Sequence, residues 1–103
     1  MGLDKWSTKS TPQLQKHIRN LARDSAKVAI VLHASVRMRE RKISRIEVLE
    51  CLRQGVIRQT PEPDLKKGDL RCRMEHYVAG RDIAAIVSLS DECPDLLVVT
   101  VFL

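Results

Sequence analysis

The last third of the chain contains the pattern that most restricts its fold, three predicted strands separated by turns. Apolar and polar residues alternate over residues 70–78, which is typical of a strand that buries only one face. Residues 83–89 are mostly apolar on both sides, and residues 96–103 form β-structure strongly, so both predict central strands. Gly80 and Pro94 lie in the turns between them. The sequence therefore predicts a β-meander.

Helices are predicted before these strands. Residues 11–21 show an amphipathic pattern that begins with Pro12, a residue favoured in the first turn of a helix. Ser44 and Glu47 fit a capping box at the start of another helix, and Gly55 follows the predicted end of that helix. Helices grouped before strands predict an α+β fold, in which N-terminal helices pack on one face of an antiparallel β-sheet.

Two interpretations compete for residues 28–32. Three of these five residues are β-branched, which favours a short buried strand. Leu21, Val28 and Leu32 also keep helical spacing, which would instead extend the first helix. We favour the strand, followed by a helix over residues 34–41.

The chain is basic, with 18 Lys and Arg against 13 Asp and Glu and a net charge of +5. Such an excess in a small domain favours a polyanionic partner such as RNA, although many small basic domains bind no nucleic acid. Aromatic residues make up only 3% of the chain, which argues against a sheet that stacks several bases on aromatic side chains.

Several function classes lack sequence support. The three cysteines form no C-x-x-C pair, so neither a disulfide framework nor a metal site is predicted. The chain contains no phosphate-binding loop and no dinucleotide-binding motif, so no cofactor is expected. We see no signal peptide and no apolar run that would span a membrane, and therefore expect a cytoplasmic protein with no membrane partner.

The stretch from His33 to Ser44 is the strongest candidate site. RNA carries its own nucleophile, the 2′-hydroxyl, so a ribonuclease needs only a base, an acid and cations, without a metal. A helix over this stretch would place a histidine, a carboxylate and arginines on one face. The strand at residues 70–78 would present further arginines and a tyrosine on its polar face. The predicted catalytic residues are His33, Glu40 and Tyr77, and the predicted nucleic-acid-binding residues are Arg37, Arg41, Arg71, Arg73 and Arg81. The helix and strand residues converge if the helix packs beside the polar face of that strand.

Structural roles compete with these assignments. His33 precedes a helix, where a capping or half-buried histidine is common. Glu40 lies three residues after Arg37, and a helical ion pair at that spacing is ordinary. Arg71 and Arg73 alternate with apolar residues, as on any solvated strand face.

The pattern H-A-x-x-R-M-x-E-R-x-I-S over residues 33–44 resembles the hallmark of a small bacterial domain family of unknown function. The resemblance covers roughly residues 28–103 and implies that residues 1–27, a polar tail and a helix, are added to the domain. That family is similar in layout to the RelE and BrnT toxins, which are barnase-like ribonucleases. This likeness implies a curved antiparallel sheet, metal-independent RNA cleavage and an antitoxin protein as partner.

The leading hypothesis is therefore a toxin-like domain that cleaves RNA. The alternative is a non-catalytic module of a toxin–antitoxin-type system that binds nucleic acid or protein. In a third interpretation, the motif is a structural ion-pair network that joins helix and sheet. An open cationic cleft would favour the first two hypotheses, whereas a buried and fully paired motif would favour the third.

Overall fold

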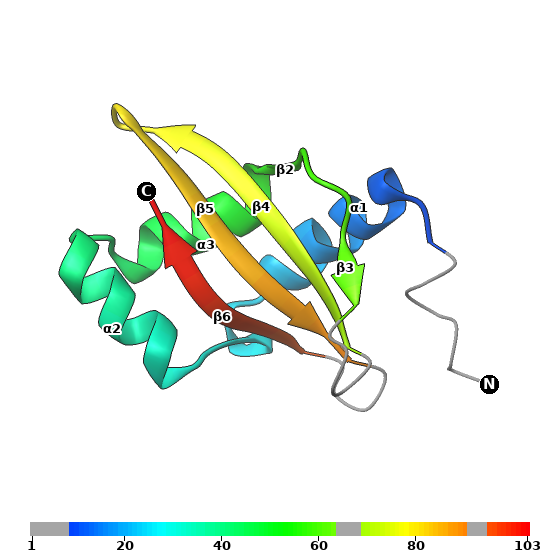
Figure 1. The fold of residues 1–103 in the computed structure, drawn as a ribbon, viewed down its shortest axis with the longest axis horizontal. Helices are drawn as coiled ribbons and strands as arrows, with labels where there is room; N and C mark the ends of the chain where they lie inside the picture. Colours follow the sequence, from blue (N-terminus) through cyan, green and yellow to red (C-terminus); the bar gives the residue numbers. More distant parts are fainter. Residues whose placement is uncertain (1–8, 64–68, 91–94) are drawn as a thin grey trace.

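The computed structural model describes residues 9–63, 69–90 and 95–103, in which helices cover one face of a six-stranded sheet (Figure 1). The helices are α1 (Thr11–Ala22), the single 3₁₀ turn η2 (Ser25–Lys27), α2 (Leu32–Arg41) and α3 (Arg45–Gln54). The strands are β1 (Val28–Ile30), β2 (Val56–Ile57), β3 (Glu62–Pro63), β4 (Leu70–Val78), β5 (Arg81–Leu89) and β6 (Leu96–Phe102). The predicted α+β class is confirmed. The predicted polar N-terminus up to residue 8 and most of the turn predicted around Pro94 lie outside the described residues. Gly68 predicts a further turn at residues 66–69, and most of this turn lies outside them too.

The sheet is mixed, with the strand order β1-β6-β5-β4-β2 and with β3 also paired to β4. The preferred strand at residues 28–32 is confirmed over 28–30, where it pairs with β6 in parallel. The prediction of a purely antiparallel sheet is therefore wrong at this edge. Parallel neighbours need a long connection, and here α2, α3 and four strands lie between β1 and β6 in the chain.

The β4–β5 hairpin confirms the predicted meander. Val78 and Arg81 are the last paired residues, so the turn consists of Ala79 and Gly80 alone. Both have positive φ, 53° for Ala79 and 78° for Gly80, as two-residue hairpin turns that match the strand twist require. The residue alternation of β4 is also confirmed, because Cys72 and Met74 are fully buried while their neighbours are not.

A β-bulge interrupts β6. Ile86 of β5 pairs with Thr100, whereas the next residue, Val87, pairs with Val98, so Val99 is the extra residue. Val98 and Val101 are consequently both buried. The bulge thus reverses the alternation and directs Thr100 and Phe102 away from the helices, towards the open face of the sheet.

The helix α3 supplies much of the core. Its capping box is confirmed, because the Ser44 hydroxyl accepts from the Glu47 amide and the Glu47 carboxylate accepts from the Ser44 amide. Helical spacing predicts that Ile46, Leu49 and Leu52 face the core, which is confirmed for the two leucines and wrong for Ile46, which is 70% exposed. Val48 and Cys51 complete the buried face of the helix.

Two arginines join α1 to α3. Arg19 donates from Nε and Nη2 to the Gly55 carbonyl, over 3.0 and 2.7 Å, and from Nη2 to the Gln54 carbonyl. In return, Arg53 of α3 donates to the Ala22 carbonyl over 2.6 Å. Each helix therefore satisfies carbonyls that the other leaves free at its C-terminal end. Leu14, Ile18 and Ala22 of α1 are buried in the same core, so the core extends across the predicted boundary at residue 27.

The chain between α3 and β4 forms less regular structure than expected. A strand is predicted over residues 56–60, but β2 ends at Ile57, and a second short strand, β3, pairs with the opposite end of β4. Pro63 in β3 lacks an amide hydrogen, which is tolerated on an edge strand. The chain between β2 and β3 is not paired with β4, and the pairing on this side of β4 is therefore interrupted at Cys72 and Arg73.

Candidate nucleic-acid interface

The predicted polar face of α2 is exposed to solvent. Ala34 is the residue of α2 that is fully buried, and the helix packs against β6. His33 and Glu40 are exposed, and Arg37 lies 3.6 Å from Glu40 in an ion pair. If His33 is a general base or acid, Glu40 would either orient it or share its role; in the described part of the chain, no hydrogen bond or ion pair joins the two side chains.

Positive charge is concentrated at the end of α2. The segment from residue 37 to residue 45, called the basic junction below, has five cations and one carboxylate, a formal net charge of +4. The whole chain has a net charge of +5. Of the junction cations, Arg39, Arg41, Lys42 and Arg45 are exposed. The charge excess of the protein therefore lies mainly on one short surface segment, instead of being spread over the molecule.

The backbone at the end of α2 explains why this segment is so tightly turned. Lys42 has a left-handed conformation, with φ 56° and ψ 45°, and its amide donates to the last carbonyls of the helix. The Ile43 amide donates to the Met38 carbonyl over 2.8 Å, which completes a Schellman-type end. Ile43 is buried, and Ser44 starts α3 directly afterwards. Two helices therefore meet with Arg41 and Lys42 on their outer corner.

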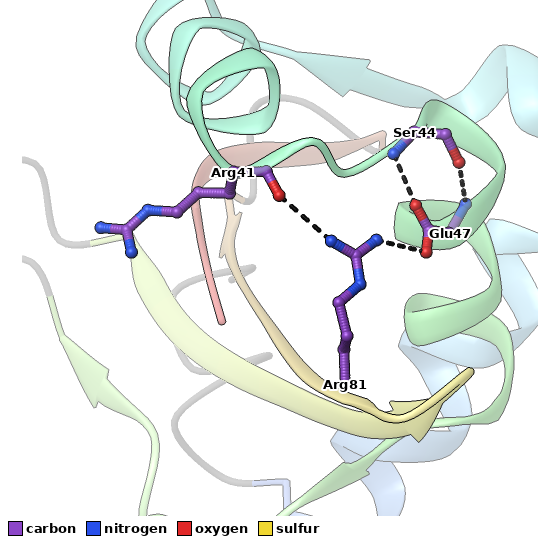
Figure 2. A network of polar contacts seen from close by, with 4 residues as sticks. All are labelled: Arg41, Ser44, Glu47 and Arg81. Carbon is purple, nitrogen blue, oxygen red and sulfur yellow. Dashed lines mark hydrogen bonds and ion pairs between the residues drawn. The ribbon is translucent and has the colours of Figure 1, made fainter.

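Arg81 holds this corner in place by hydrogen bonds. Its Nη1 donates to the Arg41 carbonyl over 3.1 Å, and its Nη2 donates to Glu47 Oε2 over 2.6 Å (Figure 2). Glu47 is held in addition by the Ser44 amide. The guanidinium of Arg81, which was predicted to bind nucleic acid, therefore links the β4–β5 hairpin to the connection between α2 and α3 (Figure 2).

The same contacts lower the pKa of the Glu47 carboxyl. The hydrogen bond from the Ser44 backbone contributes most, followed by the hydrogen bond from Arg81, and both favour the charged form. A depressed folded-state pKa stabilises the protein above the unfolded value, and this stabilisation is lost as the pH falls through the folded value.

Glu47→Gln is therefore expected to lower the urea midpoint at pH 7, and to lower it less at pH 3, because the falling pH increasingly protonates Glu47 in the wild type as well. Glu50→Gln, on the same helix, is the matched control, because Glu50 forms no ion pair with this network in the part of the chain that the structure describes. A Glu47→Gln difference that is the same at both pH values would show that the carboxylate charge does not stabilise the corner.

The predicted site residues of β4 lie on the face of the sheet that the helices do not cover. Arg71, Arg73 and Tyr77 alternate along β4 with residues that face the core. The helix α2 packs against β6, and β5 lies between β6 and β4. The expected convergence of α2 with the polar face of β4 is therefore not observed. His76 also faces the helix side of the sheet, opposite Ile83.

The open face of the sheet contains a hollow of about 320 Å³. Its lining residues come from the chain between β2 and β3 and from four adjacent strands, β3 to β6, and they are Gln59, Thr60, Glu62, Arg71, Arg73, Ile86, Thr100 and Phe102. Arg73 donates from Nε to Glu75 over 3.1 Å, and its guanidinium carbon lies 5.4 Å from the centroid of the Phe102 ring. Arg71 lies opposite Glu62 in the β3–β4 register.

Most residues of this hollow were not predicted from the sequence. Thr100 and Phe102 lie in a strongly apolar run and reach the open face only because of the bulge at Val99. Gln59 and Thr60 belong to a segment for which a regular strand is predicted. Arg71 and Arg73 are the two members that strand alternation does predict.

The described residues favour neither a cysteine nucleophile nor a metal site. Burial raises the pKa of the Cys51 and Cys72 thiols to about 12 each, so neither is a nucleophile at neutral pH. In residues 9–63, 69–90 and 95–103, no three His, Cys, Asp or Glu side chains are grouped as a metal site requires. None of the helices described is long and apolar enough to cross a membrane.

The fold and the site define a small α+β domain with a basic helix–helix corner and a polar hollow on its open sheet face. The chain belongs to the family described as Domain of unknown function (DUF4258), whose model matches residues 30–103. Searches of curated proteins and of solved structures found no significant match.

Proposed function

We propose that this protein is an RNA-directed domain that holds the RNA backbone at the basic junction. The observation that carries the proposal is the charge of the junction, +4 out of +5 for the whole chain, on exposed side chains. Phosphate contacts dominate the affinity of most nucleic-acid binders, and arginine suits phosphate because its planar guanidinium donates in pairs. The corner is rigid, because Arg81 and the capping box fix its backbone.

The test is the binding of a fluorescently labelled single-stranded RNA, measured by anisotropy at several salt concentrations. The double variant Arg37→Gln/Arg41→Gln is expected to weaken binding by about tenfold and to reduce the salt slope by about 1.4, as two lost phosphate contacts would. The matched control, Lys16→Gln/Arg23→Gln, removes two exposed charges from α1 and from its C-cap. Equal losses in the two double variants would mean that net charge alone attracts RNA, without a site.

Metal-independent RNA cleavage is the second candidate, as in the RelE and BrnT toxins, to which the family that the motif resembles is similar in layout. One observation favours it: Arg73 holds the Glu75 carboxylate over 3.1 Å, and Tyr77 follows on the same strand face. In such a reaction a base removes the 2′-hydroxyl proton, and the 2′-oxygen attacks phosphorus. The P–O5′ bond then breaks, and an acid protonates the leaving 5′-oxygen. The product is a 2′,3′-cyclic phosphate.

This second candidate is tested by incubating the purified protein with RNA in EDTA and by analysing the ends of any fragments. His33→Ala, Glu40→Ala and Tyr77→Phe remove the predicted catalytic groups one at a time. Cleavage that none of the three substitutions slows would reject the assigned catalytic residues. Salt-sensitive RNA binding without turnover would instead identify a binding module, with or without a protein partner such as an antitoxin.

A further inference from the structure

The hollow on the open sheet face differs in its electrostatics from the basic junction. Two arginines, Arg71 and Arg73, line it, but each faces a carboxylate. Glu62 lies opposite Arg71 in the strand register, and Glu75 accepts a hydrogen bond from Arg73. The formal charges of these four residues cancel. Since the two carboxylates would repel a phosphate and Glu75 already binds the Arg73 guanidinium, the hollow fits a neutral polar group better than an anion.

The residues that line the hollow suit a flat ring. Ile86 and Thr100 are register partners on adjacent strands, and both line it. The Phe102 ring is 37% exposed, and the Arg73 guanidinium lies over that ring at 5.4 Å. Because Glu75 also holds this guanidinium, its plane is fixed from two sides. Aromatic rings and guanidinium planes are the two protein surfaces on which unpaired bases stack.

The rim provides hydrogen-bonding groups for the edge of such a ring. Gln59 offers an amide, Thr60 and Thr100 offer hydroxyls, and Glu62 and Arg71 offer an acceptor and a donor group. The volume of about 320 Å³ is at the lower end of the range of ligand pockets, which is about 300 to 1,000 Å³. It suits one small ring system and is too small for a base pair in a helix.

We propose that this hollow binds one unpaired nucleobase, beside Phe102 and the Arg73 guanidinium, so that the domain selects single-stranded over double-stranded RNA. The inference rests on the proposed function and extends it, because phosphate binding at the basic junction would not by itself distinguish the two forms. Stacking is insensitive to salt, whereas phosphate contacts are weakened by it. The two sites therefore have separate experimental signatures.

The experiment compares the affinity for a labelled single-stranded RNA with that for a blunt duplex of equal length. Phe102→Ala is expected to weaken single-strand binding about fivefold or more at every salt concentration, with duplex binding unchanged, and Phe102→Tyr is expected to restore it. Leu103→Ala is the matched control, since Leu103 is 50% exposed but does not line the hollow. A set of RNAs with a single abasic position, moved along the strand, should include one that abolishes the Phe102→Ala effect.

The outcomes separate the two proposals. If single-stranded and duplex RNA bind equally and Phe102→Ala changes neither affinity, the base site is rejected, while binding at the basic junction stands. If Phe102→Ala and Leu103→Ala weaken binding equally, the effect is a general loss at the chain end and the base site is again rejected. If no RNA binds at any salt concentration, both proposals fail.

Discussion

Gly55→Ala is expected to lower the free energy of unfolding by about 3 kcal/mol or more, because no space exists for a methyl group at this position. An added Cβ would overlap the Cys51 carbonyl oxygen and would lie 2.8 Å from the Glu75 carbonyl oxygen. Both obstacles are backbone atoms, which a side-chain rotation cannot move. The substitution therefore forces the end of α3 away from β4. Chemical unfolding in urea measures the loss.

Gly80→Ala is the matched control for this substitution. No atom lies within 4 Å of a Cβ built at Gly80, but φ is +78° there. The expected cost is about 1 kcal/mol and comes from backbone strain alone. Equal losses for the two variants would mean that the close approach of α3 to β4 relaxes at little cost.

Gly55 also shows how a correct local signal can have a different cause from the expected one. A glycine after a helix predicts a left-handed C-terminal residue, and the helix does end there. Gly55, however, has φ −73°, which every residue adopts readily. The glycine is required because two backbone carbonyls lie too close for a Cβ, that of Cys51 in the last turn of α3 and that of Glu75, in a strand 20 residues later in the chain. No local pattern contains the second of these contacts.

Features determined by neighbouring residues were predictable. The Ser44–Glu47 capping box, the hairpin turn at Gly80 and the buried side of β4 each depend on residues close together in sequence, and all three are confirmed. The short parallel strand β1 was predicted as a strand, but its direction depends on the path of the whole chain. The β-propensity of its residues predicts that β1 is a strand, whereas the path of the chain through the whole fold determines which strand it pairs with.

The candidate site was less predictable, because it depends on register. Strict alternation from Leu96 would direct Thr100 and Phe102 towards the helices, and one extra residue, Val99, reverses both. The sequence also does not indicate which strand α2 packs against. His33 would converge with the β4 arginines only if α2 packed beside β4, and it packs against β6. The exposed polar face of α2 was predictable, since it depends only on helical spacing.

Arg81 illustrates the limit of predicting function from residue type. An arginine after a hairpin turn in a basic protein is a reasonable phosphate ligand, and the sequence offers no reason to separate it from Arg71 or Arg73. Its guanidinium instead donates to a carbonyl and a carboxylate within the fold (Figure 2). We therefore expect Arg81 to affect RNA binding through the shape of the basic junction.

A chain that begins at Val28 is expected to lose cooperative unfolding altogether, although the family match begins at residue 30. The helix α1 buries Leu14 and Ile18, which are 2% and 0% exposed. Burying two such side chains contributes about 3 to 6 kcal/mol, and the hydrogen bonds of Arg19 to the end of α3 add about 1.5 to 3. Domains of this size have a total stability of about 5 to 15 kcal/mol, so the loss is of the same order as the whole.

Two point variants make the truncation result interpretable. Ile18→Ala is expected to lower the free energy of unfolding by about 2 to 5 kcal/mol while keeping a cooperative transition, because it removes only part of the α1 contact. Lys16→Ala, at an exposed position of the same helix, is expected to change it by less than about 0.5 kcal/mol. Circular dichroism during urea titration follows all three proteins. A truncated chain with a full cooperative transition would show that the sheet, α2 and α3 form a self-sufficient core, and that α1 only covers it.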